Sequence, residues 1–343
     1  MALLSILMPC VQGSERGSVN VLVYDSAGEG DHSILYHSLH YHNVSFRVGS
    51  LASRQGQPYR GYQDRTPWLH RELSNTDTSQ VVMHVDARDT LCLCKSGELR
   101  SKYTALAQGR NVVIVAAEPF LWPDEGSTHA AYRGKSLEDA YGAISNASTA
   151  SATSKMTYIN TGLLAARPRA LMHFFECVRR IFPQFPDACP REIAPRTGAI
   201  VSSYSEHARY NFTKNWWHGP LQMKGWWGWD QACFHMYHME QVSGRLPGWC
   251  PSLVLDTHVQ LMLSMGKQAR QLQWHNEKLR VQYKPTGAWP CFMHAGGPYK
   301  HLLSKLKRWW TRNAQSEHQR LQTRLLKAKA ECIMKSKSDA TGC

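Results

Sequence analysis

Short runs of apolar and β-branched residues, each about the length of one strand, recur along the chain between helical or polar segments. The first run, Val19 to Tyr24, is followed by the polar, glycine-bearing loop Asp25-Ser-Ala-Gly-Glu-Gly-Asp and by a helix expected from near His32. A strand, a glycine-bearing loop and a helix in this order are typical of an open α/β sheet. We therefore predict an α/β protein.

The remaining elements follow from the same patterns. Strands are expected at residues 44–48, 80–85, 111–117 and 158–165, and helices at 67–73, at 170–181 and from Gly228 onward. Residues 126–155 are rich in Ser, Thr, Ala and Gly and are predicted to form an exposed loop. Residues 182–228 carry several prolines and tryptophans without a steady period, which predicts a long, Trp-rich insertion.

The C-terminal part of the chain is strongly basic. From His301 to Ile333 the pattern is helical, with apolar residues on one side and many Lys and Arg on the other. This segment accounts for much of the net charge of +14, which favours anionic partners such as nucleotides, nucleic acid or a membrane surface. A helix folded back on the domain is the alternative. We divide the chain into an N-terminal segment (1–18), a main domain (19–303) and a basic helical tail (304–343).

The compartment is indicated by weak signals. No apolar run approaches the roughly 20 residues of a membrane helix, so no transmembrane span is predicted. Residues 1–10 are apolar enough for the remnant of a secretory signal, and sequons at Asn43, Asn146 and Asn211 favour a lumenal location. We expect the endoplasmic reticulum or Golgi lumen or secretion, with cytoplasm and nucleus left open. The Cys92-Leu-Cys94 segment is interpreted as two neighbouring core thiols.

The sharpest chemical signal is an apolar strand that ends in two carboxylates, Asp86 and Asp89. In open α/β sheets the ligand crevice lies outside the carboxyl ends of the strands, so this pair is expected at the site. Two neighbouring carboxylates repel each other unless a cation lies between them, and a divalent metal is the usual partner. A helix cap or a solvated turn is the structural alternative.

Four further segments have residues suited to sugar-nucleotide chemistry. Trp122, which follows a strand ending in Glu118, would offer a flat face to a sugar ring or simply plug the core. Asn160 lies in a strand, and Asp230 opens a helix as an acid, a base or an N-cap. His294 precedes a glycine pair and Lys300, which suits a metal ligand and a diphosphate partner, or an ordinary surface turn.

Taken in order, these segments resemble the glycosyltransferase domain of procollagen lysyl hydroxylases and the related collagen glycosyltransferases. The resemblance covers roughly Val19 to Leu303 and rests on Val85-Asp-Ala-Arg-Asp, Ala117-Glu-Pro-Phe-Leu-Trp-Pro-Asp, Tyr158-Ile-Asn-Thr-Gly, Trp229-Asp-Gln and His294-Ala-Gly-Gly-Pro-Tyr-Lys. It implies a GT-A fold, which is a Rossmann-like, open mixed sheet flanked by helices. It also implies a manganese ion, and UDP-glucose or UDP-galactose as donor.

The resemblance also assigns roles to individual residues. Asp86, Asp89 and His294 would hold Mn²⁺. The expected catalytic and sugar-pocket residues are Asp230, Asn160 and Trp122, and the expected donor-binding residues are Tyr24, Arg65, Arg88, Gly297, Lys300 and Gln231. Three departures concern specificity: Arg88 stands where the family commonly has an aromatic residue between the two aspartates, Gly296 replaces an asparagine, and the stretch before Asp230 is considerably longer than in the family.

We therefore predict a UDP-sugar-dependent hexosyltransferase that transfers glucose or galactose to a hydroxyl acceptor. Hydroxylysine or galactosyl-hydroxylysine of a collagen-like protein is the first acceptor, and a glycan is also considered. The alternatives are a glucosyltransferase acting on a hydroxymethylated DNA base, which the basic tail and the tryptophans would suit, and a catalytically inactive sugar-binding homologue.

Overall fold

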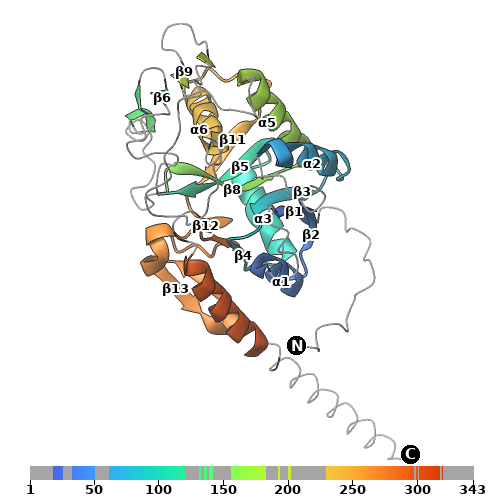
Figure 1. Cartoon of the computed structure of the whole chain (residues 1–343), viewed down its shortest axis with the longest axis vertical. Coiled ribbons are helices and arrows are strands. Elements are labelled where there is room, and N and C mark those ends of the chain that lie inside the picture. Colours follow the sequence, from blue (N-terminus) through green and yellow to red (C-terminus); the bar gives the residue numbers. More distant parts are fainter. Residues whose placement is uncertain are drawn as a thin grey trace, which may run out of the picture.

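A six-stranded sheet forms the centre of the computed structural model (Figure 1), in the order β11-β5-β8-β3-β1-β2. The strands are β1 (Val19–Asp25), β2 (Ser45–Ser50), β3 (Val81–Asp86), β5 (Val112–Glu118), β8 (Tyr158–Ala166) and β11 (Ser252–Asp256). β8 runs antiparallel to β3 and β5, and the other pairs are parallel. The structure describes residues 18–25, 33–50, 62–119, 131–132, 135–136, 139–141, 156–182, 192–193, 200–201, 229–296, 299, 301–316 and 319.

Helices cover both faces of this sheet. One face packs against α2 (Tyr62–Ser74), α5 (Pro168–Ile181) and α6 (Trp229–Val242), and the other against α1 (Ile34–Tyr41) and α3 (Ser96–Ala107). Because side chains alternate along a strand, Leu22 and Tyr24 join the first core while Val21 and Val23 join the second. This burial on both faces explains why the strands read as continuous apolar runs.

A second, smaller sheet adjoins the carboxyl ends of the central strands. It has the order β12-β15-β4, built from β12 (Met262–Ser264), β15 (Phe292–His294) and β4 (Thr90–Cys92). A third core lies beneath it, with the hairpin β13 (Leu272–His275) and β14 (Arg280–Tyr283) and the 3-10 helices η3 (Gly266–Gln271) and η4 (Asn276–Lys278). Further two-residue strands are β6 (Ala131–Tyr132), β7 (Lys135–Ser136), β9 (Glu192–Ile193) and β10 (Ile200–Val201).

The basic helix folds back on the domain over its described length. Residues 301–316 are helical, and Leu306, Trp310 and Ala314 are buried in the third core. Figure 1 shows this helix beside the β13 region. The boundary that we expected at residue 303 therefore falls inside a helix whose apolar side is part of the domain.

The predicted α/β class, an open mixed sheet flanked by helices, is confirmed, and this is the architecture expected of a GT-A domain. None of the helices in the described ranges is both long and apolar enough to cross a membrane. The segment 1–17 and most of the predicted loop (126–155) and insertion (182–228) lie outside the described residues, as does the tail beyond 319.

One cysteine interpretation is wrong. Cys92 is a buried free thiol, but Cys94 forms a disulfide with Cys291, 197 residues away in sequence. A second disulfide joins Cys177 of α5 to Cys250. Local spacing could not reveal these pairs, because the partners meet only through the tertiary fold.

Candidate functional site

Two aspartates and a histidine from distant segments meet where β3 ends. Asp86 is the last residue of β3, and Asp89 immediately precedes β4. His294 ends β15, which pairs antiparallel with β4 so that His294 lies opposite Thr90. The backbone N–H of Ala295 donates to the carbonyl of Asp89 at 2.8 Å, which fixes the histidine strand beside the aspartate turn.

The three side chains are close enough to share one cation. Nε2 of His294 lies 3.3 Å from Oδ1 of Asp89 and 3.6 Å from Oδ2 of Asp86. One ligand atom from each residue lies within 4.8 Å of the others. Asp89 and His294 are buried, whereas the side chain of Asp86 is 27% exposed. The cluster therefore has a solvent-facing side at Asp86.

The electrostatics of His294 fit a cation site. Burial alone lowers the pKa of this imidazole, but the carboxylates of Asp89, Asp86 and Glu118 outweigh burial and raise the pKa to about 9. Within the described part of the chain, both ring nitrogens are buried and make no well-aligned hydrogen bond. A buried imidazole nitrogen without a hydrogen bond, facing two carboxylates, matches a ligand set of two oxygens and one nitrogen for a manganese-like ion.

Glycines enclose the imidazole. A Cβ atom added at Gly162 of β8 would lie 2.8 Å from Cε1 of His294 and 2.8 Å from Oδ1 of Asn160. A Cβ atom at Gly296 would lie 2.6 Å from the same Cε1 atom. The group that lies against Gly162, the glycine of the Tyr158-Ile-Asn-Thr-Gly segment, is therefore the imidazole of His294.

The expected donor-binding residues Arg65, Tyr24 and Arg88 surround Asp86. Nη1 of Arg65, on α2, donates to Oδ1 of Asp86 at 3.0 Å. Tyr24 lies beside Asp86 in the β1–β3 register, but its ring is buried and packs edge-on against Trp68 with centroids 5.6 Å apart. Arg88 lies in the turn between the two aspartates and is partly exposed.

Asn160 and Gln231 converge on a carboxylate to which we assigned no role, Glu118 at the end of β5. Nδ2 of Asn160 donates to Oε2 of Glu118 at 2.9 Å, and Nε2 of Gln231 donates to Oε1 at 2.6 Å. Ser264 of β12 lies 3.5 Å from Oε2. Burial raises the pKa of Glu118 to about 7, although these hydrogen bonds oppose the increase. The amide donors of both residues are therefore engaged by Glu118.

In the sequence, Glu118 shares the feature that identified Asp86 as a candidate: both are acidic residues at the end of a buried strand. Asp256 shows that this signal is ambiguous. It ends β11 and is buried, but its oxygens accept hydrogen bonds from the backbone N–H groups of Gln260, Leu261 and Met262 at 2.6–3.2 Å. Asp256 therefore caps a turn.

The remaining predicted site residues are not placed. Trp122, Gly297 and Lys300 lie outside the described residues, and of Asp230 the structure describes only its position in the first turn of α6. Gln231, the next residue, reaches Glu118, so the N-terminus of α6 lies beside the Glu118 cluster.

Comparison with known proteins gives likenesses in structure and none in sequence. No protein-family model matches the chain, and no curated protein matches it. A similar solved structure is a crystal structure of a glycosyltransferase involved in the glycosylation of the major capsid of PBCV-1. The two are 11% identical, with a TM-score of 0.42, and the match covers 84% of this chain and 98% of that one. Because this score is below 0.5, we base neither the fold nor the chemistry on the match.

Proposed function

We propose that this chain is a divalent-metal-dependent glycosyltransferase that moves glucose or galactose from a UDP-sugar to a hydroxyl acceptor. The observation that carries the proposal is the convergence of Asp86, Asp89 and His294 at the carboxyl end of β3. Sequence reasoning required these three groups to meet although His294 comes from the other end of the domain. A purely structural histidine would not need two carboxylates within 3.6 Å.

The position of the cluster supports a nucleotide as the ligand. In open α/β sheets, ligands bind outside the carboxyl ends of the strands, where Asp86 and Glu118 lie. An ion held by two carboxylates and one imidazole keeps coordination positions for the oxygens of a diphosphate. Arg65, with 16% of its side chain exposed, lies beside Asp86 and supplies a positive charge to the same anion.

Transfer of the hexose requires stabilisation of the negative charge that develops on the departing UDP. A bound cation supplies that stabilisation electrostatically. Asp86, Asp89 and His294 fix its position, and Arg65 orients the diphosphate. Asn160 and Gln231 position Glu118, whose charge also acts on His294. Gly297 and Lys300 remain predicted diphosphate contacts, and Trp122 and Asp230 remain predicted contacts of the hexose and the acceptor.

The proposed acceptor is hydroxylysine or galactosyl-hydroxylysine of a collagen-like protein. It derives from the sequence resemblance. The proposed location is the endoplasmic reticulum or Golgi lumen or the exterior, which the buried disulfides Cys94–Cys291 and Cys177–Cys250 support, because such bonds persist in oxidising compartments.

The test combines cation binding with turnover. Calorimetric titration of the purified chain with Mn²⁺, with and without UDP, should show binding of both, and Mn²⁺-dependent release of UDP should follow with UDP-glucose or UDP-galactose. Asp86→Asn and Asp89→Asn should each reduce this release about 100-fold or more. Glu277→Gln, at an exposed carboxylate on η4, is the matched control and should leave it unchanged.

Mass spectrometry of hydroxylysine peptides and of hydroxymethylated DNA, each incubated with the active donor, then identifies the acceptor. A wild-type chain that binds neither Mn²⁺ nor UDP would refute the proposal.

A further inference from the structure

The disulfide between Cys94 and Cys291 joins the two segments that carry the candidate metal ligands. Cys94 follows β4, five residues after Asp89, and Cys291 precedes β15, which ends in His294. Both cysteines are buried, at 1% and 0% exposure. The backbone N–H of Leu93 also donates to the carbonyl of Cys291 at 2.7 Å. The disulfide thus lies at one end of the β4–β15 ladder, and the Asp89–His294 contact lies at the other.

The ladder itself is short. β4 and β15 pair over three residues, from Phe292–Cys92 to His294–Thr90, and β12 pairs with β15 over three. Such short strands supply few hydrogen bonds, so a covalent link adds substantially to what holds β15 in place. Reduction would leave the position of His294 to a few backbone contacts.

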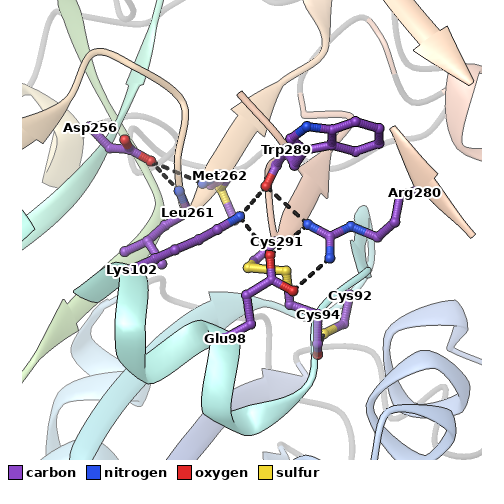
Figure 2. Close-up of a disulfide and its surroundings, with 10 residues drawn as sticks. All are labelled: Cys92, Cys94, Glu98, Lys102, Asp256, Leu261, Met262, Arg280, Trp289 and Cys291. Atoms are coloured by element: carbon purple, nitrogen blue, oxygen red, sulfur yellow. Dashed lines mark hydrogen bonds and ion pairs between the residues drawn. A yellow bond between two sulfur atoms is a disulfide. The ribbon is translucent and has the colours of Figure 1, made fainter. Parts of the chain in front are cut away.

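A polar network reinforces the same connection from α3 (Figure 2). Glu98 of α3 accepts two hydrogen bonds from the guanidinium of Arg280, at 2.6 and 2.7 Å. Lys102, one turn later, forms an ion pair with Glu98 at 2.9 Å and donates to the carbonyl of Trp289. Arg280 donates to the same carbonyl at 3.3 Å. These bonds therefore connect the segment that precedes β15 to α3, which packs against the central sheet.

The neighbouring thiol does not compete for this disulfide. Cys92 is buried in β4, and its Sγ donates to the carbonyl of Cys94 at 3.4 Å. Burial raises the pKa of Cys92 to about 12, so it stays protonated at neutral pH. Because the thiolate is the species that attacks a disulfide, Cys92 is a poor nucleophile for exchange with Cys94–Cys291.

We propose that the Cys94–Cys291 disulfide is a positioning element of the metal centre, which holds β15 against β4 and so keeps His294 against Asp89 and Asp86. Its reduction lowers the affinity for divalent cations while the central sheet stays folded. A dithiol reductant supplies two electrons and two protons, the S–S bond is replaced by two thiols, and the reductant leaves as its own disulfide. The proposal rests on the proposed function for the identity of the bound ion.

The experiment measures Mn²⁺ affinity in two redox states of the full chain. Wild-type protein is titrated with Mn²⁺ by calorimetry as purified, and again after treatment with dithiothreitol and anaerobic desalting. Circular dichroism checks the secondary structure of each sample. We expect the dissociation constant to rise about 10- to 100-fold on reduction, the range typical for loss of groups that orient metal ligands.

Matched variants separate positioning from general stability. Cys94→Ser with Cys291→Ser should reproduce the reduced state without any reductant. Cys177→Ser with Cys250→Ser removes a different buried disulfide, between α5 and the segment before β11, and should leave Mn²⁺ affinity unchanged even if it lowers the melting temperature. Glu98→Gln keeps the disulfide but weakens the network, and should raise the dissociation constant by a smaller factor.

The outcomes distinguish the two proposals. One outcome is that the oxidised wild-type protein binds Mn²⁺ and that the reduced protein, while still folded, binds it equally well. This outcome overturns the positioning role and leaves the proposed function standing. An equal loss of affinity in the Cys177 and Cys250 double variant would also overturn the positioning role, because the effect would then be global. If the oxidised wild-type protein binds no Mn²⁺, the proposed function itself fails.

Discussion

Nε2 of His294 lies 3.3 Å from Oδ1 of Asp89, in a contact between β15, the middle strand of the small sheet, and the turn that follows β3 of the central sheet. Both side chains are buried, and the carboxylates around His294 raise its pKa despite its burial. The contact depends on neighbours as well as on the two residues themselves, and these neighbours can be tested separately.

Replacing Gly162 with alanine should displace His294. The new Cβ would lie 2.8 Å from Cε1 of His294 and from Oδ1 of Asn160, closer than a carbon atom can approach. We expect a loss of about 1–3 kcal/mol in the free energy of unfolding and about a tenfold weaker binding of Mn²⁺. Chemical denaturation and calorimetry measure the two effects. Gly97→Ala is the control, because its Cβ would meet no atom within 4 Å; a Gly162→Ala variant indistinguishable from it would contradict the close approach of His294 to this glycine.

Replacing Arg65 with glutamine should change cation and nucleotide binding in opposite directions. The guanidinium of Arg65 lies 3.0 Å from Oδ1 of Asp86 and repels a metal cation bound to the same carboxylate. Without this positive charge, Mn²⁺ alone should bind a few-fold more tightly. UDP in the presence of Mn²⁺ should bind about tenfold more weakly, because a charge-assisted contact to the diphosphate is lost. Calorimetric titrations with each ligand test both signs. Arg47→Gln, which breaks an exposed pair with Glu72, should change neither affinity.

Replacing Glu118 with glutamine should destabilise the protein. Two oxygens of Glu118 accept hydrogen bonds from Asn160 and Gln231, whereas a glutamine offers one oxygen and turns an N–H group toward a donor. The expected loss is about 1–3 kcal/mol in the free energy of unfolding, measured with urea. Glu176→Gln, at an exposed carboxylate paired with Arg180 on α5, should cost far less. Equal losses in the two variants would show that the buried network adds nothing.

Stability should fall as the pH drops from about 6.5 to about 4. Burial lowers the pKa of His42 to about 4, and the positive charges of Arg280 and Lys95 add to this decrease. Burial also lowers the pKa of His238 to about 4. Below pH 6.5 these two histidines are protonated in the unfolded chain but not in the folded chain, so each contributes a loss of up to about 1.4 kcal/mol per pH unit. Glu118, whose pKa is raised to about 7, contributes in the opposite direction over part of this range.

Urea unfolding at several pH values measures this dependence. His42→Phe should flatten the curve between these two pH values, whereas the same change at exposed His37 on α1 should not. An unchanged slope in the His42→Phe variant would show that the buried ring does not resist protonation.

Much of the central sheet could be predicted from the sequence, because strands buried on both faces leave continuous apolar runs. β1, β3, β5 and β8 begin and end within a residue or two of the predicted bounds. The central-sheet strand β11 and the hairpin β13–β14 were not predicted. α3 and the three-residue strands β4, β12 and β15 were also missed, since such short strands carry no detectable period and α3 lacks a clear apolar stripe. One of the missed sheets, β12-β15-β4, is the one that carries His294.

The sequence by itself determined that Asp86 and Asp89 follow a buried strand, and the family resemblance of its motifs added His294 as a candidate ligand for the same ion. Only the tertiary structure decided that Glu118 gathers Asn160 and Gln231, that Gly162 approaches an imidazole, and that Cys94 pairs with Cys291. The physical reason is the range of the interactions. Strand patterns and strand ends are set by neighbours along the chain, whereas these contacts join side chains that become neighbours only when separate strands pack together.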